Sequence, residues 1–116
     1  MYKLLPLFLF AYGLTVTTEN IYDNSWALVI GIDKYQNVPN LSYAVKDAES
    51  INEILVNSFA FPKENITFLK NEDATKQNIL KSFSDITKKA QDNDRVLIYF
   101  AGHGETMDLP EGGEKG

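Results

Sequence analysis

Two uninterrupted runs of apolar and aromatic residues, Trp26–Ile32 and Val96–Ala101, dominate the pattern of hydrophobic and polar positions. Such runs, rich in β-branched and aromatic residues, are typical of parallel strands that are covered on both faces. We therefore predict a central strand at Trp26–Ile32 and a strand covered on both faces at Val96–Ala101. A shorter segment, Ile66–Leu69, lies between polar neighbours and is predicted to be a third strand.

Between these segments, apolar residues recur at steps of three and four, which places them on one face of an α-helix. Ser42 is predicted to cap the first helix and Pro62 to stop it. Thr75 is predicted to cap the second helix, which ends before the polar turn at 92–94. The predicted apolar faces consist of Ala44, Ala48, Ile51, Leu55 and Phe59 in the first helix and of Ile79, Phe83, Ile86 and Ala90 in the second.

The resulting β-α-β-α-β order, with short loops, predicts an α/β fold. One parallel sheet with right-handed crossovers would carry helices on its faces. Three strands and two helices are about half of a usual doubly wound domain, and the last strand has no neighbour on its far side. We therefore expect an incomplete fold, the N-terminal half of such a domain.

Composition narrows the chemistry that this one small domain could carry. The 116 residues include 16 acidic and 11 basic side chains, for a net charge of -5. Because no basic stripe is present, we predict that the partner is not a nucleic acid. The sequence contains no cysteine, which excludes disulfides, thiolate metal sites and a cysteine nucleophile within this chain.

The N-terminus has the pattern of a targeting segment. Lys3 supplies a short positive region, Leu4–Phe10 is apolar, and Ala11-Tyr12-Gly13 resembles a cleavage signal. The run is too short for a transmembrane helix. We predict a signal peptide at 1–18, the domain at 19–116, a secreted or periplasmic location, and no stable membrane insertion after the signal is removed. A buried N-terminal strand or helix is the alternative.

The only histidine, His103, directly follows the last predicted strand and lies between Gly102 and Gly104. Ligands of open α/β sheets bind at the carboxyl ends of strands, so His103 is placed to meet a substrate. The glycines allow a sharp turn and the close approach of a substrate or another loop. A surface-loop histidine is the alternative. His103 alone cannot form a zinc site, which needs two or three further ligands. As a general base it would need a nucleophile within hydrogen-bond reach. The glycines around it do not have the spacing of a phosphate-binding loop.

Four segments resemble the caspase-like cysteine peptidases, in particular the bacterial caspase-like proteins and the metacaspases. The segments are WALVIGIDKY at 26–35, LSYAVKDA at 41–48, Ala74-Thr75, and VLIYFAGHG at 96–104. They occur in the order and spacing of that family, and the resemblance covers residues 26–116. It implies a three-layer α/β/α caspase-like fold and a cysteine-type endopeptidase that hydrolyses peptide bonds in a protein or peptide substrate.

The resemblance also implies roles for individual residues. His103 would be the histidine of a Cys–His dyad, which keeps the thiolate reactive and protonates the leaving amine. Gly104 would offer its backbone N–H to the oxyanion. Asp47 would line the S1 pocket and favour Lys or Arg at the cleavage position. The alternative for Asp47 is an acidic residue that the helix macrodipole favours near a helix N-terminus.

The chain departs from the family where the catalytic centre should be completed. The nucleophilic cysteine is expected roughly 50 residues beyond the histidine, and the chain has none. Ala101 stands where metacaspases often carry a serine. Ca²⁺ is implied as a cofactor by the resemblance alone, because Asp108, Glu111 and Glu114 lack the spacing of a calcium loop.

We therefore expect a fragment of a peptidase that is inactive by itself. Two other readings stay open at this point. One is a catalytically inactive pseudo-protease or interaction module that keeps the fold. The other is an unrelated flavodoxin-like ligand-binding domain in which His103 is incidental.

Overall fold

The structure is a computed structural model that describes residues 21–104. The predicted signal peptide and the acidic residues Asp108, Glu111 and Glu114 lie outside the described residues. The β-α-β-α-β order is confirmed, and two short 3₁₀ helices flank the second strand. In chain order, the elements are β1 (Ser25–Gly31), α3 (Ala44–Phe59), η1 (Lys63–Asn65), β2 (Ile66–Lys70), η2 (Asn71–Asp73), α4 (Lys76–Lys89) and β3 (Arg95–Ala101).

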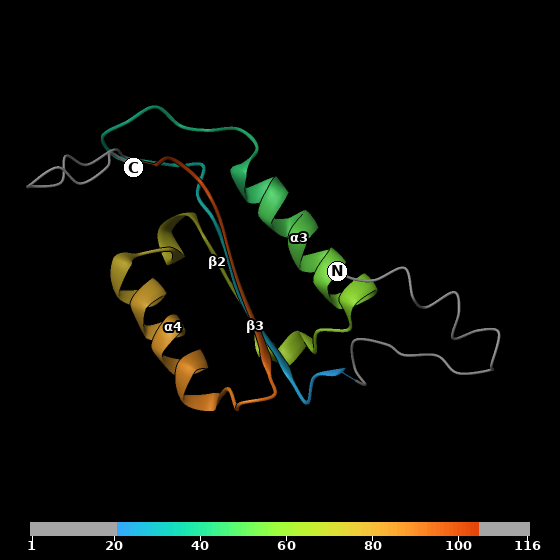
Figure 1. Cartoon of the computed structure of the whole chain (residues 1–116). Coiled ribbons are helices and arrows are strands. Elements are labelled where there is room, and N and C mark those ends of the chain that lie inside the picture. The colour runs from blue at the N-terminus through green and yellow to red at the C-terminus, as the bar shows by residue number, and fades with distance from the viewer. Residues whose placement is uncertain (1–20, 105–116) are drawn as a thin grey trace, which may run out of the picture.

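The three strands form one parallel sheet in the order β2-β1-β3, so the predicted central position of the first strand is confirmed. The chain moves from β1 to β2 in one direction and then returns across β1 to β3. Crossovers of one hand in opposite directions place their helices on opposite faces. Figure 1 shows this arrangement, with the sheet seen edge-on between α3 and α4. The three-layer α/β/α architecture is thus confirmed.

The core lies on both faces of β1, because successive side chains of a strand point to opposite sides. Ala27 and Val29 pack with Ala48 and Leu55 of α3, whereas Leu28 and Ile30 pack with Ile86 of α4. Each fully buried aliphatic side chain of this size contributes about 1.5–3 kcal/mol relative to an exposed one. The predicted apolar faces hold in the middle of both helices but not at Phe59 and Phe83, which are 45% and 48% exposed.

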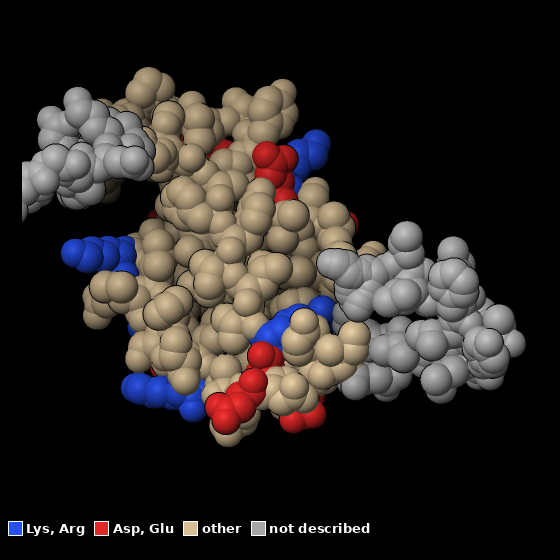
Figure 2. Space-filling model, viewed as in Figure 1, with Lys and Arg blue, Asp and Glu red and all other residues tan. Residues whose placement is uncertain are grey.

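The prediction that Val96–Ala101 is covered on both faces was wrong for the residues described. Leu97 and Tyr99 pack against the core on the α3 side, but Val96, Ile98 and Phe100 are 46%, 46% and 49% exposed. The reason is topological: among the described strands, β3 lies at the edge of the sheet, and α4 packs over β1. The face drawn in Figure 2 has a broad uncharged surface, and the charged side chains visible on it lie mainly toward its margins.

The cap of α3 also differs from the prediction, because Ser42 makes no cap bond. Tyr43 is the N-terminal flanking residue of α3, and it makes no side-chain cap bond either. The Asp33 carboxylate, from two residues beyond the end of β1, accepts the backbone N–H of Ala44 at 2.8 Å and that of Val45 at 3.4 Å. Thr75 caps α4 as predicted, because its hydroxyl oxygen accepts the backbone N–H of Asn78 at 3.1 Å.

Gly31 lets α3 approach the end of β1 closely. A Cβ atom at Gly31 would lie 2.8 Å from the Cβ of Ala48 and 2.9 Å from the Cα of Val45. Contacts that short require the backbone of α3 to move away. The glycine therefore brings the N-terminus of α3 to the carboxyl end of β1, where the Asp33 carboxylate can reach it.

At the N-terminal ends of the strands, side chains from the residues just after α4 hold β1 and β3 together. The Asp94 carboxylate accepts the backbone N–H of Gln91 and the indole N–H of Trp26, both at 2.9 Å. The hydrogen bond from Gln91, followed by the one from Trp26, holds the pKa of Asp94 below its usual range. The guanidinium of Arg95 donates to the Ser25 hydroxyl and lies 4.2 Å from the ring centroid of Phe61. The N-terminal ends of β1 and β3 are thereby tied together.

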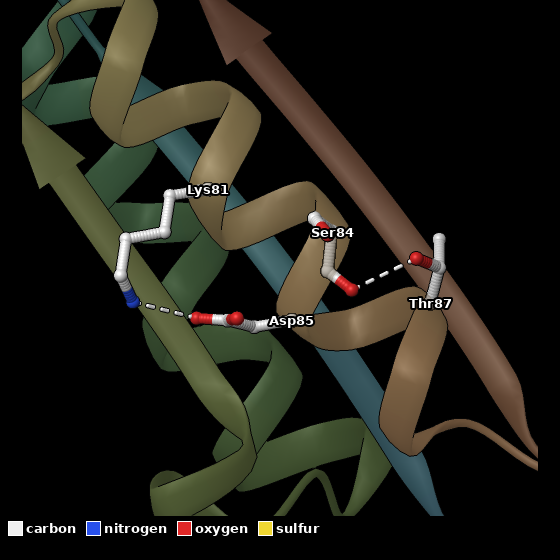
Figure 3. Close-up of polar contacts among 4 residues, drawn as sticks. All are labelled: Lys81, Ser84, Asp85 and Thr87. Carbon is white, nitrogen blue, oxygen red and sulfur yellow. Dashed lines mark hydrogen bonds and ion pairs between the residues drawn. The ribbon is translucent and has the colours of Figure 1, made fainter.

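The outer surface of α4 carries local polar pairs, drawn in Figure 3. Lys81 and Asp85, one turn apart, form an exposed ion pair at 2.8 Å. The hydrogen bond from Lys81 holds the pKa of Asp85 below its usual range. The hydroxyl of Thr87 donates to the carbonyl of Ser84 at 2.9 Å. Solvent screens such exposed pairs, so this face contributes little to stability and does not position the site.

Candidate active site

His103 lies at the carboxyl edge of the sheet, just beyond the end of β3. The segment between β1 and α3, residues 32–43, arcs over the same edge and passes the end of β3 (Figure 1). The N-terminus of α3 reaches this edge as well, because Asp33 caps it. Two parts of the chain that are distant in the sequence, residues 32–43 with the start of α3 and the residues after β3, thus meet where α/β proteins bind their ligands.

The imidazole of His103 is oriented by a backbone carbonyl. Its Nε2 atom lies 2.9 Å from the carbonyl oxygen of Pro39. Because a carbonyl oxygen can only accept a hydrogen bond, Nε2 must carry the proton. In the neutral ring, Nδ1 is then the unprotonated, basic nitrogen. The exposed imidazole can therefore take up and return a proton at Nδ1, while Pro39 holds the other side of the ring.

Tyr35 contacts both the backbone and the ring of His103. Its hydroxyl oxygen accepts the backbone N–H of His103 at 2.7 Å. The two rings meet edge to face, with their centroids 4.7 Å apart and an interplanar angle of 67°. Gly102 makes room for this contact, because a Cβ atom there would lie 2.6 Å from the Tyr35 hydroxyl oxygen. The predicted close approach of another loop to a glycine is confirmed at Gly102.

Gly104 is exposed and follows the imidazole by one residue. An added Cβ atom at Gly104 would meet nothing within 4 Å among the described residues. These residues therefore leave room for a substrate carbonyl to approach the backbone here. The role of the Gly104 N–H toward an oxyanion stays a prediction.

Asp47 lies in the first turn of α3 and is exposed. It shares the carboxyl edge of the sheet with His103, but no hydrogen bond or ion pair joins the two side chains within residues 21–104. The macrodipole favours a carboxylate at this position whatever its function. Both readings of Asp47, the S1 residue and the helix-terminal acid, therefore stay open.

Sequence reasoning did not single out Asp33, Tyr35 or Pro39 as site residues. A signal existed for Asp33, since it is the first polar residue after a buried strand, at the end where ligands bind. No periodicity marks Tyr35 or Pro39, because both contact His103 across more than 60 residues of sequence. Only the folded chain shows those two contacts.

Other features of the described residues place limits on binding. A hollow of about 570 Å³ lies beside Tyr35 and is also lined by Lys34, Asn71 and Glu72. Within residues 21–104, no group of three or more His, Asp or Glu side chains is arranged to hold a metal ion. Ca²⁺ as a cofactor therefore stays a prediction that rests on the resemblance alone. No helix in the same range is long and apolar enough to cross a bilayer.

Comparison with known proteins agrees with this geometry. A sequence model of the family described as "Caspase domain" matches residues 24–115. Metacaspase-1 of Eremothecium gossypii is 31% identical over 93 residues, which cover 74% of this chain and 21% of that protein. Metacaspase-7 of Arabidopsis thaliana is 34% identical over 94 residues, 77% of this chain and 23% of that protein.

Metacaspase-1 of Saccharomyces cerevisiae is 29% identical over 97 residues, 78% of this chain and 22% of that protein. The chain thus spans between a fifth and a quarter of the length of these relatives. The family match includes all the strands and helices described above together with the His103 loop. On these grounds, the chain belongs to the caspase-domain family.

Proposed function

We propose that this chain supplies the catalytic histidine of a cysteine-type endopeptidase, and that the cysteine comes from a longer protein that contains it. The observation that carries the proposal is the Pro39 carbonyl on Nε2 of His103, which leaves Nδ1 as the basic nitrogen at the ligand-binding edge of the sheet. Membership of the caspase-domain family supports the reaction class. That membership also removes the reading of an unrelated flavodoxin-like domain.

The proposed chemistry follows from the two ring nitrogens of His103. Nδ1 accepts the proton of the cysteine thiol, and the thiolate attacks the carbonyl carbon of the scissile peptide. The backbone N–H of Gly104 stabilises the oxyanion. Nδ1 then returns the proton to the leaving amine, and water hydrolyses the acyl-enzyme. The Pro39 carbonyl stabilises the imidazolium through a charge-assisted hydrogen bond.

The proposal places the cysteine on a further strand beside β3. Among the described strands, none pairs with β3 on its far side. A further parallel strand on that side would end at the same carboxyl edge as β3, next to His103. We propose that the cysteine lies at the end of such a strand, on the same edge of the sheet as Nδ1 of His103.

We expect the full-length protein to cleave reporter peptides and residues 1–116 alone to be inactive, because this chain has no cysteine. The measurement compares both proteins on matched peptides with Lys, Arg or Asp at the cleavage position. A thiol-alkylating reagent should abolish the activity of the longer protein. Hydrolysis by purified residues 1–116 would contradict the proposal. A folded but inactive full-length protein would instead favour an interaction module, whose binding surface the exposed face of β3 could supply.

We further propose that Asp47 selects basic side chains at the cleavage position. The proposal is supported by an exposed carboxylate at the edge that carries His103. In the full-length protein, Asp47→Asn should lower kcat/KM for Lys and Arg peptides by about 10- to 100-fold, the value of one charge-assisted hydrogen bond. Glu49→Gln, an exposed change on the same helix, is the matched control. If both variants lose activity equally, or neither does, Asp47 is only a helix-terminal acid.

A further inference from the structure

We propose that Tyr35 is a positioning residue for His103, which holds the histidine so that Nε2 stays on Pro39 and Nδ1 remains the proton-exchanging nitrogen. The importance of this for catalysis rests on the proposed function. The positioning itself is a property of the described chain and can be measured without activity.

One side chain makes two contacts of different kinds with His103. The Tyr35 hydroxyl oxygen accepts the His103 backbone N–H at 2.7 Å, which fixes the peptide plane between Gly102 and His103. The edge-to-face contact, at 4.7 Å between ring centroids, limits the rotation of the imidazole. An exposed histidine between two glycines would otherwise sample several backbone and side-chain conformations. Tyr35 therefore lowers the population of conformations in which Nε2 is not bonded to the carbonyl of Pro39.

Tyr35 and Pro39 belong to one closed loop, which makes their contacts with His103 interdependent. The backbone N–H of Leu41 donates to the carbonyl of Asp33 at 2.7 Å and closes the loop at its base. Within it, the backbone N–H of Tyr35 donates to the side-chain oxygen of Asn40 at 3.0 Å. The loop thus presents a hydroxyl, an aromatic edge and a carbonyl to His103 as one unit.

The loop is also anchored at the other edge of the sheet, next to the end of β2. Asn71, in η2 after β2, accepts the backbone N–H of Asp33 at 3.0 Å and that of Lys34 at 3.2 Å. Asn71 has a φ of 47°, in the left-handed region that asparagine tolerates better than most residues. The position of Tyr35 is therefore determined by β1, η2 and the loop together, before any substrate binds.

Gly102 provides an independent way to disturb the same contact. A Cβ atom at this position would lie 2.6 Å from the Tyr35 oxygen and 2.9 Å from the Phe100 ring. Gly102→Ala therefore leaves Tyr35 chemically intact but displaces its hydroxyl from the His103 N–H. Tyr35→Phe removes the acceptor and keeps the aromatic ring. The two variants share only the loss of this hydrogen bond.

The test uses residues 1–116, as in the printed sequence. It measures the ¹⁵N NMR shifts of the histidine ring and the rate of amide hydrogen exchange at His103. In the unaltered chain, we expect the ring nitrogen shifts of one dominant Nε2–H tautomer. Tyr35→Phe should move both shifts toward those of a tautomer mixture and speed His103 amide exchange about tenfold, the loss expected for one hydrogen bond. Tyr43→Phe, which alters a tyrosine that is 69% exposed and flanks the N-terminus of α3, is the matched control and should change neither.

Gly102→Ala should reproduce both changes, which keeps the proposal testable if Tyr35→Phe fails to fold. In the full-length protein, Tyr35→Phe should lower kcat about tenfold with little change in KM, because the hydroxyl acts on the histidine and not on the substrate. Unchanged ring shifts and amide exchange in folded Tyr35→Phe and Gly102→Ala would overturn the proposal. Changed shifts in a protein without peptidase activity would uphold the positioning and refute the proposed function.

Discussion

Replacing His103 with alanine should abolish the proposed peptidase activity of the full-length protein while leaving the fold intact. An unassisted thiol, with a pKa near 8.5, is mostly protonated at neutral pH. Without Nδ1, nothing in the proposed site would take the thiol proton or protonate the leaving amine. We expect kcat/KM to fall by roughly 10³-fold or more. Steady-state hydrolysis of a reporter peptide by the purified variant measures this loss.

The fold should survive because His103 is exposed and belongs to neither cluster of the hydrophobic core. The free energy of unfolding in urea should change by no more than about 0.5 kcal/mol, as for most surface substitutions. His103→Gln keeps a side chain that can donate to Pro39 but cannot act as a base, so it should be as inactive as the alanine variant. Activity within tenfold of the unaltered protein in either variant would assign the acid–base role elsewhere.

Asp33→Ala should lower the free energy of unfolding by about 2–3 kcal/mol, more than removal of a single ordinary N-cap. The carboxylate accepts two backbone N–H groups of α3 and lies next to the positive end of the helix dipole. The truncation leaves both donors without that acceptor. Urea denaturation of residues 1–116, followed by circular dichroism, measures the change. Because Asp33 also begins the loop of Tyr35 and Pro39, the His103 ring shifts should change in the same variant.

Two further variants separate capping from general damage at this end of the sheet. Asp33→Asn keeps an oxygen acceptor, and asparagine is as good an N-cap as aspartate, so it should recover most of the lost stability. Ser42→Ala tests the cap that the sequence predicted and should be nearly neutral, because Ser42 makes no cap bond. A Ser42→Ala variant as unstable as Asp33→Ala would show that the assignment of the cap to Asp33 is wrong.

The sequence predicted the elements well where a repeating pattern carries the information. The apolar run at 26–32 and the helical spacing from Ala44 to Leu55 each report on burial over several residues, so one exception does not erase the signal. The local cap at Thr75 was predicted because its partner, Asn78, is only three residues away. The family resemblance, carried by the same segments, was confirmed by the match to residues 24–115.

The predictions failed where the answer depended on partners distant in the sequence. The composition of Val96–Ala101 suits a strand with two covered faces. Whether both are covered depends on which strand and helix lie beside it. Ser42 has the right chemistry for a cap, but Asp33 reaches the helix terminus from 11 residues away because Gly31 brings the two elements together. The preference of residue types for cap positions does not report which side chain lies close to the helix terminus in the folded chain.

The sequence by itself thus determined the α/β class, the order of the elements and the position of the single histidine at the end of a strand. Burial of regularly spaced apolar side chains dictates those features locally. The tertiary structure alone decided which ring nitrogen of His103 is bonded, through Pro39, and which hydroxyl holds its backbone, through Tyr35. Hydrogen bonds depend on distances of about 3 Å between atoms, and only the folded chain brings a loop after β1 that close to a residue after β3.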